Sequence, residues 1–383
     1  MEFIHTLLSF VASLIAGGML FVTGILASYQ STTPPISIAP PAEMHAASTT
    51  PAAATSTPTI KTSSTAQKPA AKPPAGTKTV ATAASQASAP QTSQPAPPTI
   101  DPVALNTDTR AALVNILCLS GGGGVHSISA SGVFVDSRGV ILTNAHVGQF
   151  FLLKDYPTPD NVRCTVRTGS PAQSAYYATL LYLPPAWITA NAAQITSTQA
   201  VGTGENDYAF LLVTGSASGT SLPAAFPALP MTSDEPSQGE NMLLAGYPAG
   251  FLDGFTIEQN LYISSAFANV TQLYTYGTGQ DIDLVSIGGT IVSQGGASGG
   301  AAVRASDGTL QGIIATATTA DTTAGRDLRA VTLAHINRSL NASGVGGVAA
   351  LLSGNVAAES AQFNAAIAPS EKAALVNAIQ ASN

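Results

Sequence analysis

The sequence predicts an all-β domain that is preceded by a membrane-spanning helix and a proline-rich linker and is followed by short helices. From about residue 101, short β-branched runs alternate with Gly and Asn turn signals. Long helical periodicity is nearly absent until an Ala-rich stretch at 348–382. Many short strands indicate a β-barrel or a sandwich, and a length of about 240 residues suits one double-barrel unit. The expected strands are Val133–Val135, Val140–Leu142, Phe210–Val213, Met242–Leu244 and Ile313–Ile314.

Residues 1–30 are predicted to form a transmembrane signal anchor. The 21 positions from Leu7 to Ala27 contain no charge, and a helix of that length spans the roughly 30 Å of a bilayer core. The first five residues contain no Lys or Arg, so the positive-inside rule gives no orientation. The alternative is a signal peptide that is cleaved after Ala27, which would release the protein from the membrane.

Residues 31–100 are predicted to be a disordered linker rich in Pro, Ala, Thr and Ser. This segment holds 13 of the 25 prolines and no aromatic residue. It cannot bury enough apolar surface to offset the entropy of ordering. We therefore expect a single-pass membrane protein whose folded domain lies outside the cytoplasm on an extended stalk.

Charge and cysteine content exclude several classes of protein. Only 9% of the residues are charged and the formal net charge is −7, which argues against nucleic acid as a partner. Two cysteines are too few for a Cys-rich metal site. No metal or other cofactor is predicted, because no paired His, Asp or Glu ligand spacing occurs. Cys118 and Cys164 could form a disulfide if the domain is extracytoplasmic, or remain two buried thiols.

Three residue types that could perform nucleophilic catalysis occur in separate contexts. His146 follows an apolar strand within Gly139–Val147, and Asp207 precedes the apolar run that ends at Val213. Ser298 lies in the glycine-rich turn Gly295–Gly300, where small residues let backbone N–H groups approach a substrate oxygen. Each context alone is a weak signal, but their order along the chain is informative.

Six short stretches carry a resemblance to a known family: Ser131–Val135, Ile141–Val147, Asp207–Val213, Ala245–Pro248, Ala297–Gly300 and Gly312–Ile314. Together they resemble the chymotrypsin/trypsin-like serine proteases, and among these the bacterial extracytoplasmic high-temperature-requirement branch. The resemblance implies two six-stranded antiparallel β-barrels within a protease domain at 101–340. Residues 341–383 are too few for the PDZ domain of that branch and are expected to form one or two Ala-rich helices.

The resemblance also implies a role for each residue. Ser298 would attack the scissile carbonyl, His146 would act as general base and acid, and Asp207 would hold the imidazole. The backbone N–H groups of Gly296 and Ser298 would form the oxyanion hole. The partners would be protein or peptide substrates; the sequence does not determine an oligomeric state.

Alignment on the serine places Val292 and Ser293 at the base of the primary substrate pocket. Ala315 and Ala317 would lie on its walls. None of these positions is charged, so cleavage after small or aliphatic residues is expected.

Two alternatives stay open at the level of sequence. Gly296–Gly300 also fits the G-x-S-x-G elbow of an α/β-hydrolase esterase. Its acid would then be Asp321 or Asp327 and its base His335. The second alternative is a catalytically silent, protease-like binding module.

Overall fold

The computed structural model describes residues 100–197, 202–318 and 320–382. The predicted signal anchor at 1–30 and the predicted linker up to residue 99 lie outside these ranges. No helix within the described ranges is long and apolar enough to cross a membrane.

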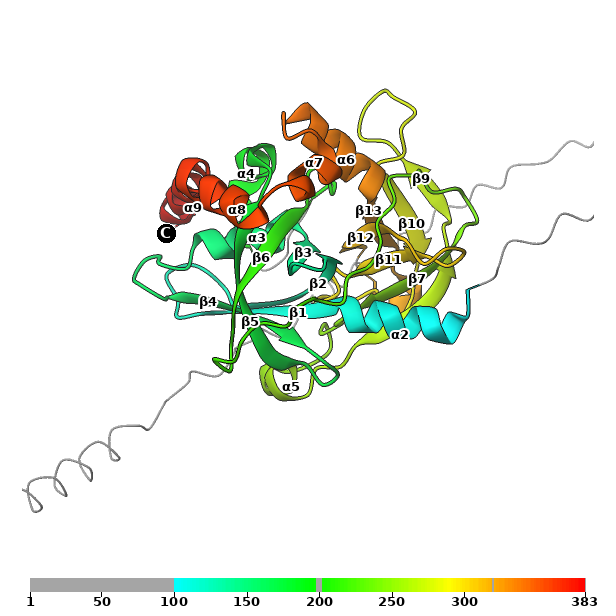
Figure 1. The fold of residues 1–383 in the computed structure, drawn as a ribbon, viewed down its shortest axis with the longest axis horizontal. Coiled ribbons are helices and arrows are strands. Elements are labelled where there is room, and N and C mark those ends of the chain that lie inside the picture. Colours follow the sequence, from blue (N-terminus) through cyan, green and yellow to red (C-terminus); the bar gives the residue numbers. More distant parts are fainter. Residues whose placement is uncertain (1–99, 198–201, 319, 383) are drawn as a thin grey trace, which may run out of the picture. The chain divides into compact units, whose positions relative to one another are not determined.

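The first half of the domain is a closed antiparallel barrel in the order β1–β2–β3–β6–β5–β4 (Figure 1). Ile116, Ile141 and Leu211 come from three different strands, lie on the same face of the sheet and are fully buried. The predicted six-stranded barrel is confirmed here. The strands are β1 (Leu113–Ser120), β2 (Ile128–Asp136), β3 (Val140–Thr143), β4 (Val162–Thr168), β5 (Gln173–Tyr182) and β6 (Ala209–Ser216).

The second half is a seven-stranded sheet in the order β8–β7–β11–β12–β13–β10–β9, so the prediction of a second six-stranded barrel needs correction. Its edge strands β8 and β9 are consecutive in the chain and are separated only by Val270 and Thr271. At this break the chain leaves its pairing with β7 and begins to pair with β10. The second half therefore has seven strands where six were expected. The strands are β7 (Asn241–Gly246), β8 (Ser264–Asn269), β9 (Gln272–Tyr274), β10 (Leu284–Gly288), β11 (Ala301–Arg304), β12 (Leu310–Ala317) and β13 (Leu328–Thr332).

Cys118 and Cys164 are joined by a disulfide. The two residues lie directly opposite each other on β1 and β4, so the bond reinforces a contact between neighbouring barrel strands. It closes a sequence separation of 46 residues, which in the chain-entropy model is worth roughly 4 kcal/mol.

Helices begin and end the described domain. Helix α8 packs on the first barrel, where the Ser360 hydroxyl and the Asn364 amide both donate to the carbonyl of Leu180 at 2.7 Å. The region after residue 341 contains three helices, one more than the larger number expected from sequence. The helices are α2 (Pro102–Ala112), α3 (Ala145–Leu152), α4 (Pro185–Asn191), α5 (Gly254–Gln259), α6 (Leu333–Ala342), α7 (Gly347–Ser353), α8 (Val356–Ala366) and α9 (Ala368–Ser382), with 3-10 turns at Ala192–Gln194 and Thr323–Gly325.

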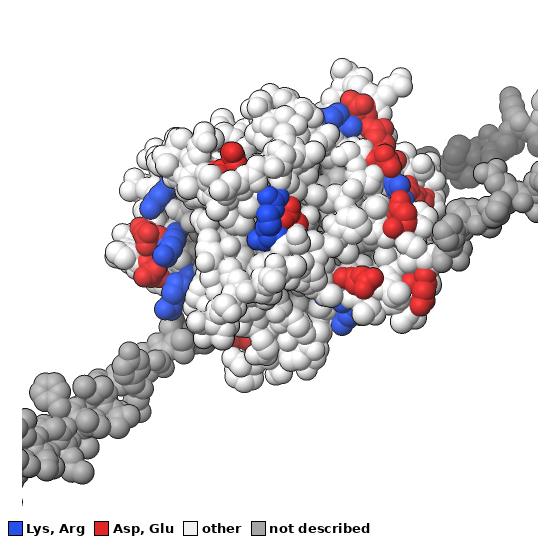
Figure 2. Space-filling model, viewed as in Figure 1, with Lys and Arg blue, Asp and Glu red and all other residues white. Residues whose placement is uncertain are grey.

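The surface is sparsely charged. Figure 2 shows one face on which uncharged residues form most of the surface and charged side chains occur in small, separated groups. No extended basic patch is visible on this face, in keeping with the formal net charge of −7.

Candidate active site

The pairing of β3 with β6 places His146 and Asp207 at the same end of two neighbouring strands. Thr143, the last residue of β3, lies opposite Ala209, the first residue of β6. His146 follows three residues after Thr143, in the first turn of α3, and Asp207 comes two residues before Ala209. Antiparallel register therefore joins residues that are 61 positions apart in the sequence.

The Asp207 carboxylate holds both the side chain and the main chain of His146. His146 Nδ1 lies 2.8 Å from Asp207 Oδ2, and the His146 amide donates to Asp207 Oδ1 at 2.9 Å. The side-chain amide of Asn144 also donates to the Asp207 backbone carbonyl at 2.9 Å. Burial opposes protonation of the imidazole, but the charge and hydrogen bond of Asp207 prevail and raise the pKa of His146 above its ordinary value. The arrangement suits a general base that becomes an imidazolium during the reaction.

The turn that carries Ser298 packs directly against β2 and β3. Gly299 has a φ of 83°, and a Cβ at this position would lie 2.1 Å from the Ser131 carbonyl oxygen and 2.4 Å from Thr143 Oγ1. Only glycine permits so close an approach. Ser298 is half-buried, and across the described ranges neither its hydroxyl nor His146 Nε2 has a hydrogen-bond partner. Such contacts are often long before substrate binds.

The two amides expected to form the oxyanion hole are free to bind a ligand. Gly296 has a φ of 91°, and a Cβ there would lie 2.6 Å from the Tyr247 carbonyl oxygen. This position therefore also requires glycine. In the part of the chain that the structure describes, the N–H groups of Gly296 and Ser298 have no hydrogen-bond acceptor.

Three of the four residues predicted for the substrate pocket are buried in the structure: Val292, Ser293 and Ala315. The Ser293 hydroxyl accepts a hydrogen bond from the Thr290 amide at 2.9 Å. The side chain of Ala317, at the end of β12, lies outside the described part of the structure. The three described residues present no charge that would select a charged substrate side chain.

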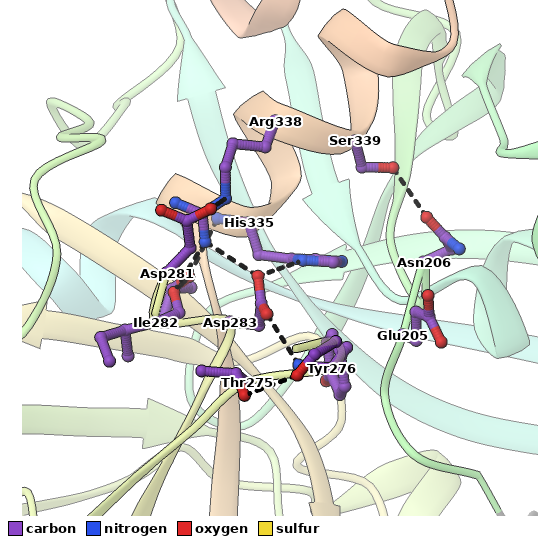
Figure 3. A network of polar contacts seen from close by, with 12 residues as sticks. Glu205, Asn206, Thr275, Tyr276, Asp281, Ile282, Asp283, His335, Arg338 and Ser339 are labelled. Atoms are coloured by element: carbon purple, nitrogen blue, oxygen red, sulfur yellow. Dashed lines mark hydrogen bonds and ion pairs between the residues drawn. The ribbon is translucent and has the colours of Figure 1, made fainter. Parts of the chain in front are cut away.

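A second His–Asp pair links α6 to the residue that precedes β10 (Figure 3). His335 Nδ1 lies 2.8 Å from Asp283 Oδ1, and Arg338 donates to the same oxygen at 2.8 Å. Burial lowers the pKa of His335 despite its contact with Asp283. Because Arg338 already neutralises Asp283, this cluster stabilises the packing of α6.

The α/β-hydrolase alternative is wrong. Strand β11 follows the Ser298 turn where a nucleophile elbow requires a helix. His335 pairs with Asp283 and not with the Asp321 or Asp327 that this alternative requires.

Sequence reasoning gave no role to three residues that support the site. Asn144 fixes the main chain at Asp207, Asn206 precedes Asp207 with a φ of 57°, and Ser131 contacts the Ser298 turn. For Asn144 and Asn206, the signal in the sequence is a polar residue within two positions of His146 or Asp207. Ser131 stood within a recognised motif, but its pairing across the two halves of the domain is a property of the tertiary structure.

Residues 130–313 match the model of a known protein family, the trypsin-like peptidase domain. The chain contains a trypsin-like peptidase domain. Its enzyme class is therefore that of the serine endopeptidases. Among the described residues, no group of three or more His, Cys, Asp or Glu side chains could hold a metal ion.

The peptidase domain is also similar to solved structures. The active form of the Rv3671c protease from M. tuberculosis is 17% identical over 69% of this chain and 96% of that chain, with a TM-score of 0.39. The HtrA-type protease AlgW with a tripeptide is 19% identical over 63% of this chain and 64% of that chain, also with a TM-score of 0.39. A search of curated proteins finds no significant match.

Proposed function

We propose that the peptidase domain hydrolyses peptide bonds with Ser298 as nucleophile, His146 as general base and Asp207 as the acid that orients it. The observation that carries this proposal is the 2.8 Å contact between His146 Nδ1 and Asp207 Oδ2. With Nδ1 held by Asp207, Nε2 of His146 is available to accept the proton of Ser298. The turn that carries Ser298 packs against the same half of the domain, where Gly299 lies close to Ser131 and Thr143.

The chemistry follows from these positions. Ser298 Oγ attacks the carbonyl carbon of the scissile bond while His146 Nε2 takes the hydroxyl proton. The N–H groups of Gly296 and Ser298 stabilise the resulting oxyanion, each contributing about 2.7–4 kcal/mol. The C–N bond then breaks as His146 returns the proton to the leaving amine. Water, activated by the same imidazole, hydrolyses the acyl-enzyme ester and restores the Ser298 hydroxyl.

The test is labelling of the full-length protein by a fluorophosphonate probe together with digestion of casein. The wild-type protein should be labelled and should digest casein, whereas Ser298→Ala should do neither. His146→Ala should remain folded and lose most of both activities. Absence of Ser298-dependent labelling in the folded wild-type protein would refute the proposal and favour the silent binding module.

We propose further that cleavage follows small or aliphatic residues. The uncharged side chains of Val292, Ser293 and Ala315 support this preference, since none of them can pair with a charged substrate side chain. A peptide library should be cleaved mainly after Ala, Val, Ile or Leu. A profile dominated by Arg, Lys or Glu would contradict the proposal.

We also propose that residues 1–30 anchor the protein in a membrane with the peptidase domain outside the cytoplasm. The uncharged segment from Leu7 to Ala27 supports an anchor. The Cys118–Cys164 disulfide supports an oxidising compartment. Protease added to intact cells should degrade the domain, and alkaline extraction should leave the protein in the membrane pellet. Full recovery in the culture medium would instead support a cleaved signal peptide.

A further inference from the structure

We infer that Ser131, on β2 of the first barrel, is a positioning residue that orients the oxyanion hole in the second half of the domain. The inference rests on the proposed function of Ser298. Ser131 is fully buried and contacts the catalytic turn twice. Its hydroxyl donates to the Gly296 carbonyl at 2.7 Å, and its amide donates to the Ser298 carbonyl at 2.8 Å.

Four consecutive carbonyl groups of this turn have fixed partners. The Gly295 carbonyl accepts from the Ala249 amide at 2.7 Å, and the Ala297 carbonyl accepts from the Gly300 amide at 2.9 Å. Ser131 holds the two carbonyls that alternate with these, those of Gly296 and Ser298. Each peptide unit of the turn is therefore held through its oxygen.

Peptide planarity converts these contacts into an orientation of the two catalytic amides. In a trans peptide the N–H points opposite to the C=O, so the bond at the Gly295 carbonyl directs the Gly296 N–H away from Ala249. Likewise, the hydrogen bond from the Gly300 amide to the Ala297 carbonyl directs the Ser298 N–H away from Gly300. The peptide between Gly296 and Ala297 connects these two units, and the Ser131 hydroxyl is the group that holds its carbonyl.

A side-chain hydroxyl is needed at this position because it donates and accepts at once. Ser131 Oγ accepts from the Tyr247 amide at 2.9 Å while it donates to Gly296. Alanine would leave both the Tyr247 N–H and the Gly296 carbonyl without this partner. A glycine with a φ of 91° tolerates other backbone angles. Without the Ser131 hydroxyl, this peptide would be held only by the 3.2 Å hydrogen bond from the Ala297 amide to the Gln294 carbonyl, and its carbonyl could turn away from its present direction.

The experiment compares transition-state and ground-state binding in full-length protein. A peptidyl trifluoromethyl ketone forms a tetrahedral adduct whose oxygen occupies the oxyanion hole, whereas a product peptide binds without one. Ser131→Ala should lower kcat and the affinity for the ketone by about 10- to 100-fold. This effect does not exceed the decrease in kcat caused by removal of one oxyanion-hole donor. Its affinity for the product peptide should stay within twofold of wild type.

Ser129→Ala is the matched control. Ser129 lies on the same strand, and its hydroxyl accepts from the Asn115 amide at 3.0 Å, but it has no contact with the turn. This variant should keep wild-type kcat and ketone affinity. If Ser131→Ala does not fold, Ser131→Cys carries the test, since a thiol is a weaker donor at the same position.

Two results would overturn the inference while the proposed function stands. Ser131→Ala could retain kcat and ketone affinity within twofold, or it could lose ketone and product-peptide affinity equally, which indicates general distortion. If Ser298→Ala keeps wild-type activity, the proposed function itself fails and the role of Ser131 fails with it.

Discussion

The Ser339 hydroxyl on α6 donates a 2.7 Å hydrogen bond to the side-chain oxygen of Asn206, the residue immediately before Asp207. Asn206 has a φ of 57°, a left-handed conformation that costs most L-residues about 1–2 kcal/mol. The Tyr208 hydroxyl donates to the same Ser339 oxygen at 2.8 Å. Helix α6, which follows strand β13, thus helps to hold the turn from which Asp207, the proposed triad acid, projects.

Replacement of Asn206 should separate backbone strain from the loss of this hydrogen bond. Asn206→Ala loses both the hydrogen bond and the tolerance for a positive φ, so kcat/KM and the free energy of unfolding should both fall, the latter by about 1–3 kcal/mol. Asn206→Gly keeps the conformation and should lose less of each. Kinetics and denaturant unfolding measure the two effects. Equal losses in the two variants would show that strain at this turn is unimportant.

The acid limb of the pH–rate profile should lie above pH 6.5. Because Asp207 raises the pKa of His146 in the free enzyme, the imidazole stays protonated to a higher pH and cannot accept the Ser298 proton below its raised pKa. Activity should therefore fall as the pH decreases through that value. Measurement of kcat/KM between pH 5 and 9 tests this. Asp207→Asn should remove the shift and lower kcat by about 10⁴-fold; a limb well below pH 6.5 in the wild type would contradict the assignment.

The two His–Asp pairs should differ sharply in function despite equal contact distances of 2.8 Å. His335→Asn should lower the free energy of unfolding by about 1–3 kcal/mol, because it disrupts a buried polar cluster. It should leave the rate of fluorophosphonate labelling within severalfold of wild type. His146→Asn should abolish most of the fluorophosphonate labelling and change the free energy of unfolding little. A loss of labelling as severe in His335→Asn as in His146→Asn would show that the cluster acts in catalysis.

Much of the fold could be predicted from local sequence. The five apolar runs from Val133 to Ile314 all lie within strands, namely β2, β3, β6, β7 and β12, because β-branched residues bounded by turn signals fit a pleated, half-buried surface. The break between β8 and β9 could not be predicted. It depends on where the chain changes partner from β7 to β10, and no local propensity encodes a partner.

The candidate site could be predicted only as a set of residue types in a given order. The contact between His146 and Asp207 arises from the register of β3 against β6. Similarly, the role proposed for Ser131 depends on how β2 meets a turn 165 residues further along the chain. Such relationships follow from tertiary packing, so the single sequence suggests candidate reacting residues but not the residues that would orient them.

The stability of the peptidase domain should fall as the pH rises through the range from about 4.5 to 7. Glu371 on α9 is 3% exposed, and neither carboxylate oxygen has a hydrogen-bond partner among the described residues. Burial raises its pKa from 4.5 to about 7. A raised pKa means that the folded state binds the proton more tightly than the unfolded state does. When the pH rises and Glu371 ionises, the free energy of unfolding therefore falls, by roughly 1–3 kcal/mol above pH 7. Glu371→Gln should raise the Tm at pH 8.5 and change it little at pH 4.5, as measured by thermal unfolding. Glu359→Gln, at an exposed position on α8, should show no such pH-dependent gain, and an equal gain in both variants would refute the assignment to Glu371.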